Sequence, residues 1–275
     1  MRQFYLVNEV GMTYFLDYRT STLVSEIEDI GFEKENTYLT YENSFKKVGE
    51  KIPQASIQFT LVFLLGYKGY SDFLEFLRKS REQLRLFYKV DDSTKFMNVA
   101  FKSITKTQLE SGAITSVLVL EKMSLWLKRF NYSIRVNSSD RGKIFPFSYP
   151  FEYTSSFNGA ITIENNGDYK APLCITIMGA VSNPEVEVIK DNEVISKMRL
   201  MVSSVNCTIE VNAELTDQYM TMTEGNTVTN IYQNQDFSCD NFLFVDRGTY
   251  QIRFKPGVNS ETTCKIAILE GYGGH

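Results

Sequence analysis

The second half of the chain is a series of short apolar runs that recur at nearly even intervals, and this pattern limits the fold more than any other feature. Turn residues separate the runs, and no helical periodicity interrupts them after Gly159. Short, evenly spaced strands without helices are typical of a two-sheet sandwich of the jelly-roll type. We therefore expect about eight strands, at residues 160–164, 173–178, 186–189, 196–202, 207–211, 241–244, 250–254 and 264–269.

The first half alternates between strand-like runs and one segment with helical spacing. Strands are expected at 5–8 and 13–16 around Gly11, then at 56–63, 84–90, 95–105 and 115–125, with Asp91-Asp92 as a turn. The run 56–63 begins with alternation and ends fully apolar, which predicts a strand whose far end is buried on both faces. Strands around one helix predict an α+β domain that is sandwich-like.

The helix is expected from residue 70 to about residue 87. Ser71 is the predicted N-cap, and Asp72 and Glu75 would lie in the first turn, where acidic side chains complement the helix dipole. The apolar face recurs at helical spacing, which predicts a helix that covers a sheet. Its members are Phe73, Leu74, Leu77 and Leu84.

The junction between the two halves has its own character. Residues 137–143 are polar and rich in turn formers, which indicates a linker. Residues 144–153 interleave aromatic side chains with Pro146 and Pro150, so we expect an extended aromatic strap. With 275 residues, about two domains are expected, which we place at 1–132 and 133–275.

The sequence contains no catalytic or metal-binding pattern. Its single histidine is His275, so no Ser-His-Asp or Cys-His arrangement has an internal imidazole. Phosphate-binding and dinucleotide-binding glycine loops are also missing from the sequence. The four cysteines are too far apart for a metal knuckle, and we expect free, mostly buried thiols at Cys174, Cys207, Cys239 and Cys264. We therefore predict no catalytic, cofactor-binding or metal-binding residues and no cofactor.

Two further sets of residues have a structural and a functional interpretation. Two carboxylates suffice for a glycosidase, but Asp91-Asp92 is typical of a turn, and Glu185 with Glu187 of the wet face of a strand. A single tryptophan such as Trp126 is one way to build a sugar-stacking platform, but its apolar neighbours favour a place in a core or an interface.

Charge and hydropathy exclude several classes of partner. The 29 basic and 33 acidic residues give a net charge of −4 without a long run of one sign, which argues against contact with nucleic acid. The N-terminus lacks the apolar core of a signal peptide, and the run 59–65 is too short to cross a bilayer as a helix. We expect synthesis in a cytoplasm and no membrane insertion.

Several segments, in this order, resemble the siphophage distal tail proteins, or siphovirus tail component family. They are Leu84-Arg85-Leu86-Phe87-Tyr88 after the helix, and the runs at 120–126, 142–151, 165–173, 179–184 and 246–250. The resemblance implies a hexameric ring formed through the N-terminal domain, followed by a galectin-like or carbohydrate-binding-like sandwich. It also implies a structural, non-enzymatic baseplate hub in the virion, at the tail tip. The implied partners are copies of itself, the tail tube protein, a tail-associated or tail-tip protein and a receptor-binding protein.

The residues and the resemblance together suggest how such a ring would form. Many Tyr and Phe residues, 16 and 20 in number, offer anchors for buried contacts. We hypothesise that residues 71–87 brace the ring, while residues 22–53 supply a protruding hairpin or arm to a neighbour. Two alternatives stay open: a carbohydrate-binding module that contacts cell-wall polysaccharide, and a wall hydrolase that acts through two carboxylates.

Overall fold

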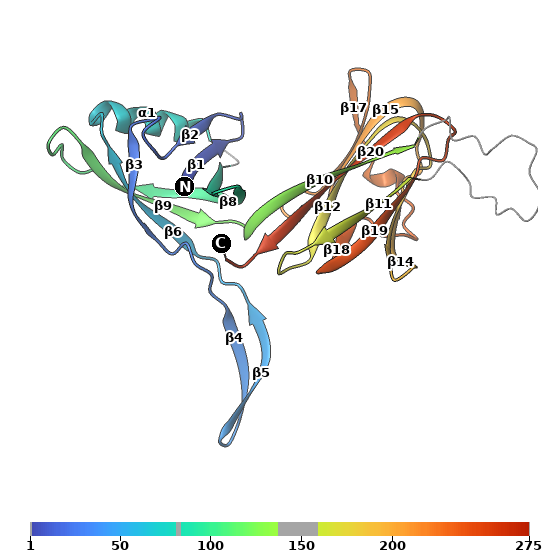
Figure 1. The fold of residues 1–275 in the computed structure, drawn as a ribbon, viewed down its shortest axis with the longest axis horizontal. Helices are drawn as coiled ribbons and strands as arrows, with labels where there is room; N and C mark the ends of the chain where they lie inside the picture. Colours follow the sequence, from blue (N-terminus) through green and yellow to red (C-terminus); the bar gives the residue numbers. More distant parts are fainter. Residues whose placement is uncertain (1, 81–83, 137–158, 275) are drawn as a thin grey trace, which may run out of the picture. The chain divides into compact units, whose positions relative to one another are not determined.

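The computed structural model describes residues 2–80, 84–136 and 159–274, and the chain forms two compact units. One unit is Met1–Lys128 with Tyr272–His275, and the other is Arg129–Gly271. The prediction of a mainly β chain with one α-helix in its first half is confirmed (Figure 1). The predicted linker at 137–143 and strap at 144–153 lie outside the described residues. The assignment of separate roles to domains 1–132 and 133–275 stays a prediction.

The first unit is an antiparallel sheet that folds back on itself. Its strands neighbour one another in the order β2-β1-β7-β8-β9-β6-β3. Phe4 of β1 contacts Phe59 of β6 edge to face, with ring centroids 5.5 Å apart, although three strands separate β1 from β6 in the sheet. The bounds are β1 Arg2–Asn8, β2 Thr13–Phe15, β3 Thr22–Glu28, β6 Ser56–Phe63, β7 Leu84–Val90, β8 Ser93–Ile104 and β9 Ile114–Lys122.

Alternation along β6 shows which face meets the core. Ile57, Phe59, Leu61 and Phe63 are buried, and every residue between them is half-buried. The expectation that the far end of this strand is buried on both faces was wrong, because Val62 stays half-buried. In a strand that packs against a core on one face only, buried and less buried side chains alternate along its whole length. This alternation does not depend on whether the outer side chains are apolar.

The helix is shorter than predicted and begins earlier. α1 spans Tyr67–Arg78, with Gly66 rather than Ser71 at its N-cap and no acidic side chain in its first turn. Gly66 has a φ of +56°, and a Cβ there would meet Leu109 and the Gly112 carbonyl, so the turn into the helix requires glycine.

Leu84 was expected both on the apolar face of the helix and at the start of a strand at 84–90, and the structure confirms the strand. Leu84 opens β7, which pairs along its whole length with β1 on one side and β8 on the other. The backbone hydrogen bonds that β7 makes with β1 and with β8 outweigh the local helical propensity of this segment. The prediction of a turn at Asp91-Asp92 is confirmed, since Val90 pairs with Ser93 across it.

The second unit is a two-sheet sandwich, as predicted. One sheet has the order β17-β16-β15-β12-β20-β10, with β18 paired to β12, and the other has the order β11-β19-β13-β14. Apolar residues of both sheets share one core, among them Ile177, Val188 and Ile252. The bounds are β10 Trp126–Val136, β11 Gly159–Asn165, β12 Ala171–Ser182, β13 Glu185–Lys190, β14 Glu193–Arg199, β15 Ser203–Asn212, β16 Tyr219–Glu224, β17 Thr227–Asn230, β18 Phe244–Val245, β19 Gly248–Lys255 and β20 Thr262–Tyr272.

Seven of the eight strands expected after Gly159 are present with shifted ends, while of the strand expected at 241–244 only Phe244 lies in a strand, the two-residue β18. Three further elements were missed. β16, β17 and the short 3-10 helix η1 (Tyr232–Asn234) lie in a polar stretch that carries little apolar signal. The expected turn at 190–192 is a two-residue hairpin loop, because Lys190 pairs with Glu193 and both Asp191 and Asn192 have positive φ. Among the described residues, no helix is long and apolar enough to cross a membrane.

Candidate assembly site

Within the described residues, two strands of the first unit pair only with each other. β4 (Glu35–Tyr41) and β5 (Ser44–Lys51) form a two-stranded hairpin that stands out from the other strands of the unit (Figure 1). We call residues 35–51 the arm. The predicted protrusion between residues 22 and 53 is therefore confirmed for the arm, while Thr22–Glu28 forms β3 beside β6.

The arm exposes apolar side chains on both of its faces. Every residue of β4 is exposed, and so is every residue of β5 except Gly49. Tyr38 pairs with Lys47 and Thr40 with Phe45, so Tyr38, Phe45 and Lys47 share one face. Leu39 and Tyr41 lie on the other face. An isolated hairpin is marginally stable in water, and exposed apolar groups on an unpaired ribbon indicate a surface that another chain covers.

Ion pairs link the two strands and the preceding Lys34 near the base of the arm, where it joins the first unit. Glu50 accepts hydrogen bonds from Lys34 Nζ at 2.8 Å and from Lys47 Nζ at 2.5 Å. These two bonds lower the pKa of Glu50 to about 2. Lys51 pairs with Glu35 at 2.8 Å. All these groups are well exposed, so the pairs orient the side chains and add little stability.

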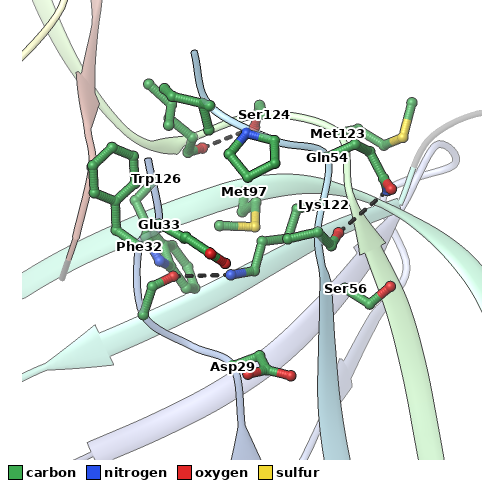
Figure 2. Close-up of a pocket in the computed structure, with 16 residues that line it drawn as sticks. Asp29, Phe32, Glu33, Gln54, Ser56, Met97, Lys122, Met123, Ser124 and Trp126 are labelled. Carbon is green, nitrogen blue, oxygen red and sulfur yellow. Dashed lines mark hydrogen bonds between the residues drawn. The ribbon is translucent and has the colours of Figure 1, made fainter. Parts of the chain in front are cut away.

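A cavity of about 750 Å³ lies where the arm joins the first unit (Figure 2). Residues 29–33, which precede β4, and residues 52–56, which follow β5, form part of its wall. Apolar lining comes from Phe32, Met97 and Trp126, among others, and ionisable groups come from Asp29, Glu33 and Lys122. The sequence did not predict this cavity, because its walls come from five separated segments of the first unit. We call it the arm-base cavity.

Lys122, the last residue of β9, ties both ends of the arm to the sheet. Its Nζ donates to the Gly31 carbonyl at 2.9 Å, and its backbone N–H donates to the Ala55 carbonyl at 2.8 Å. Burial lowers the pKa of Lys122, and the nearby Asp29 partly offsets this effect. One residue thus fixes the points at which the chain leaves and re-enters the body of the unit.

The two glutamates expected on a wet strand face are in fact shielded, which corrects that prediction. The Glu187 side chain is 7% exposed, with Arg253 Nη1 at 3.2 Å and Lys255 Nζ also bound to its carboxylate. Glu185 pairs with Lys255 at 2.8 Å. Long basic side chains from β19 lie across the carboxylates, and alternation in a single sequence does not reveal such cross-strand cover.

The remaining predicted residues have structural positions. Trp126 is 1% exposed within the core of the first unit, as predicted. The four cysteines are free thiols; Cys207 and Cys264 are buried, while Cys174 and Cys239 are half-buried. The described residues contain no group of three or more His, Cys, Asp or Glu side chains placed to hold a metal ion. His275 lies outside the described residues.

A second group of exposed aromatic side chains lies in the second unit, beside η1. The rings of Tyr232 and Phe237 are 6.5 Å apart, and those of Tyr232 and Phe242 are 6.3 Å apart. Phe237 is 63% exposed and Tyr232 is 40% exposed. The amide of Asn241 donates to the Tyr232 hydroxyl at 3.4 Å. Aromatic faces next to amides also suit small polar ligands.

The geometry defines a class: a two-unit β protein with an exposed two-stranded arm. Residues 3–123, which include the arm and most of the arm-base cavity, match the family model described as the N-terminal domain of distal tail proteins. This segment therefore belongs to the distal tail protein family, as the resemblance in the sequence predicted. The family is one of structural phage tail proteins, in agreement with the predicted place in the virion tail. No curated protein sequence matches the chain.

Solved phage structures share the fold over nearly the whole chain. A chain from the phage P2 baseplate, in its activated conformation with Ca, aligns with a TM-score of 0.70 at 15% identity, covering 97% of this chain and 98% of that one. The Dit protein of phage SPP1 aligns with a TM-score of 0.62 at 11% identity, with the same coverage. At such identities the likeness establishes the fold.

Proposed function

We propose that the chain is the distal tail subunit of a siphophage baseplate and forms a six-membered ring that joins the tail tube to the tail-tip apparatus. The observation that carries this proposal is the arm, because its apolar side chains on both faces require another chain to cover them. The ring and its six-fold symmetry are what the family resemblance implies.

Simple symmetry supports a ring over other assemblies. An arm that binds a different surface on the next copy makes a head-to-tail contact. Such contacts generate a closed ring when the rotation per subunit divides a full turn. The chain carries both elements of such a contact, a projecting hairpin and a body with a concave surface at residues 29–33 and 52–56.

The partners follow from the place of the ring. The structures that share this fold are described as part of a phage P2 baseplate and as a paradigm of the hub adsorption apparatus in phages that infect Gram-positive hosts. By analogy, this chain binds the tail tube protein on one side and a tail-associated or tail-tip protein on the other, with a receptor-binding protein as a further partner. It acts by shape and contact, as a structural subunit rather than an enzyme, and needs no cofactor.

Light scattering and negative-stain imaging of the purified protein test this proposal. Size-exclusion chromatography with multi-angle light scattering should give a mass of six subunits at high concentration, and images should show rings with a central opening. A protein that stays monomeric at high concentration, both alone and with its tail partners, would refute the proposal. A two-fold dimer in which arms pair with each other would refute it equally.

Carbohydrate binding is the second candidate function, and the aromatic group of Tyr232, Phe237 and Phe242 is the observation in its favour. Exposed ring faces beside the Asn241 amide could stack on a sugar and bind its hydroxyls. Sedimentation of the full chain with host wall polysaccharide tests this function. Saturable binding that Phe237→Ala abolishes would support it, while equal retention of both proteins would count against it.

A further inference from the structure

We propose that the arm-base cavity of one subunit is the receptor for the arm of the next, with Phe45 in its apolar part and Lys47 beside its carboxylates. This inference rests on the proposed ring and names the two surfaces that close it.

The arm is too long to reach the cavity of its own chain. The first strand of the arm begins next to the wall of that cavity, and the second strand ends next to it. Phe45 lies six residues before Lys51, the last residue of the second strand. At ~3.3 Å per residue, Phe45 is about 20 Å from the base of the arm. Only a second chain can therefore place this side chain in the cavity.

Phe45 has the properties of an interface anchor. It is 73% exposed, the largest exposed fraction among the large apolar side chains of the arm, and it lies next to the turn where the arm ends. The cavity offers Phe32, Ile52 and Met123 as accessible apolar contacts, with exposed fractions of 39%, 41% and 54%. Large aromatic side chains that fill a partner's pocket typically dominate the binding energy of an interface.

The charges of the two surfaces are complementary. Asp29 and Glu33 outnumber Lys122 among the ionisable side chains of the cavity, which leaves one formal negative charge (Figure 2). Lys47 shares a face with Phe45 and brings one positive charge. Opposite charges at an interface speed encounter and fix its register.

Little is lost when Lys47 changes partner. Its present ion pair with Glu50 is exposed on both sides, with side-chain exposures of 45% and 43%, and such pairs are weak. Glu50 also keeps a second partner, Lys34, at 2.8 Å. Lys47 is thus available for a carboxylate of another chain without leaving Glu50 unpaired.

An arm bound in the cavity also affects the direction of the receiving subunit's own arm. The walls of the cavity are the segments 29–33 and 52–56, from which the arm of the receiving subunit emerges. Lys122 fixes both segments through Gly31 and Ala55. A bound arm therefore steadies the direction of the following arm, and each contact favours the next.

Photo-crosslinking tests the contact directly. A benzophenone amino acid replaces Phe45, and the labelled protein is mixed in equal amounts with ¹⁵N-labelled copies before irradiation and peptide mass spectrometry. We expect intermolecular crosslinks from position 45 to residues 29–33, 52–56 or 122–126. Crosslinks to another surface, to a tail partner only, or only within one chain would overturn the inference. The same group at Phe237 is the control and should give none of these peptides.

A charge exchange adds an independent test. Lys47→Glu alone and Glu33→Lys alone should each weaken ring formation about tenfold or more, while the double variant should recover most of the loss. Both sites are exposed, so the variants are expected to fold. Glu193→Lys, an exposed change in the second unit, is the matched control. If the unmodified protein forms rings but the double variant does not recover, the docking contact is refuted. The proposed ring itself would then still hold.

Discussion

At the scale of single residues, the face of β13 and β19 shows how charges are buried without forming a functional site. Glu187 is almost covered by Lys255 and Arg253, which satisfy its carboxylate. We predict that Glu187→Gln lowers the free energy of unfolding by about 1–3 kcal/mol, since charge-assisted hydrogen bonds are lost from a mostly buried group. Urea denaturation measures the change. Glu193→Gln, an exposed glutamate, should change it by less than about 0.5 kcal/mol, and equal effects would contradict the prediction.

The same network predicts how stability depends on pH. Burial is the largest single effect and opposes ionisation of Glu185, but the hydrogen bonds with Lys255 and Glu187 and the positive charges of Lys255 and Lys197 together outweigh it. The pKa of Glu185 therefore lies below its usual value. A depressed folded-state pKa adds stability above the unfolded pKa of ~4.3 that is lost as pH falls through the folded value. Glu185→Gln should therefore flatten the loss of stability on acidification, which urea midpoints between about pH 2 and about pH 7 would show. Identical slopes for both proteins would exclude this contribution.

Lys255 gives the corresponding effect at high pH. Burial is the largest single effect and lowers its pKa, but the hydrogen bonds to Glu185 and Glu187 and the charges of these carboxylates together outweigh burial and raise the pKa above its usual value. Stability from a raised lysine pKa is fully present below ~10.4 and is lost as pH rises through the folded value. The network therefore contributes across the whole neutral range.

Thiol reactivity at the residue scale separates buried from accessible cysteines. Cys264 is fully buried, and burial raises its pKa to about 12. The thiolate is the reactive form, so Cys264 should resist alkylation by iodoacetamide at neutral pH until the protein unfolds. Cys239, half-buried in a loop, should react in the folded protein. Peptide mapping of the alkylated protein would reveal both rates, and similar rates in the folded state would contradict this prediction.

At the scale of elements, the strands were predictable wherever side chains alternate against a core. The helix end was not, because Leu84 fits both a helical face and the strand β7, and pairing with β1 and β8 decided between them. The arm was foreseen as a protrusion at 22–53, but its extent depends on which strands find partners. The arm-base cavity could not be predicted at all, because Asp29, Lys122 and Gly273 line it together from distant positions in the chain.

The arm itself should be dispensable for folding and essential for assembly. Its side chains are exposed and make no part of the core of the first unit. We predict that replacing residues 35–51 by a short glycine-rich turn changes the thermal midpoint little but abolishes the ring, leaving monomers by light scattering. Phe45→Ser should give the same monomers with a smaller change in sequence. A ring that survives loss of the arm would show that other surfaces close it.

At the scale of the whole molecule, the two units have separate cores. The core of the first unit contains Leu86 and the core of the second contains Ile177, and the two clusters of buried residues have no member in common. Stability that comes from separate cores is lost in separate cooperative steps. The division into domains 1–132 and 133–275 stays a prediction, which calorimetry can test.

We predict that differential scanning calorimetry of the full chain resolves two unfolding transitions. Leu86→Ala and Ile177→Ala each remove fully buried methyl groups and should cost about 2–5 kcal/mol. If the units unfold independently, Leu86→Ala lowers only one midpoint and Ile177→Ala lowers only the other. Measurements at low protein concentration keep ring formation from coupling the transitions by mass action. A single transition that both substitutions shift alike would show one cooperative unit and refute the division.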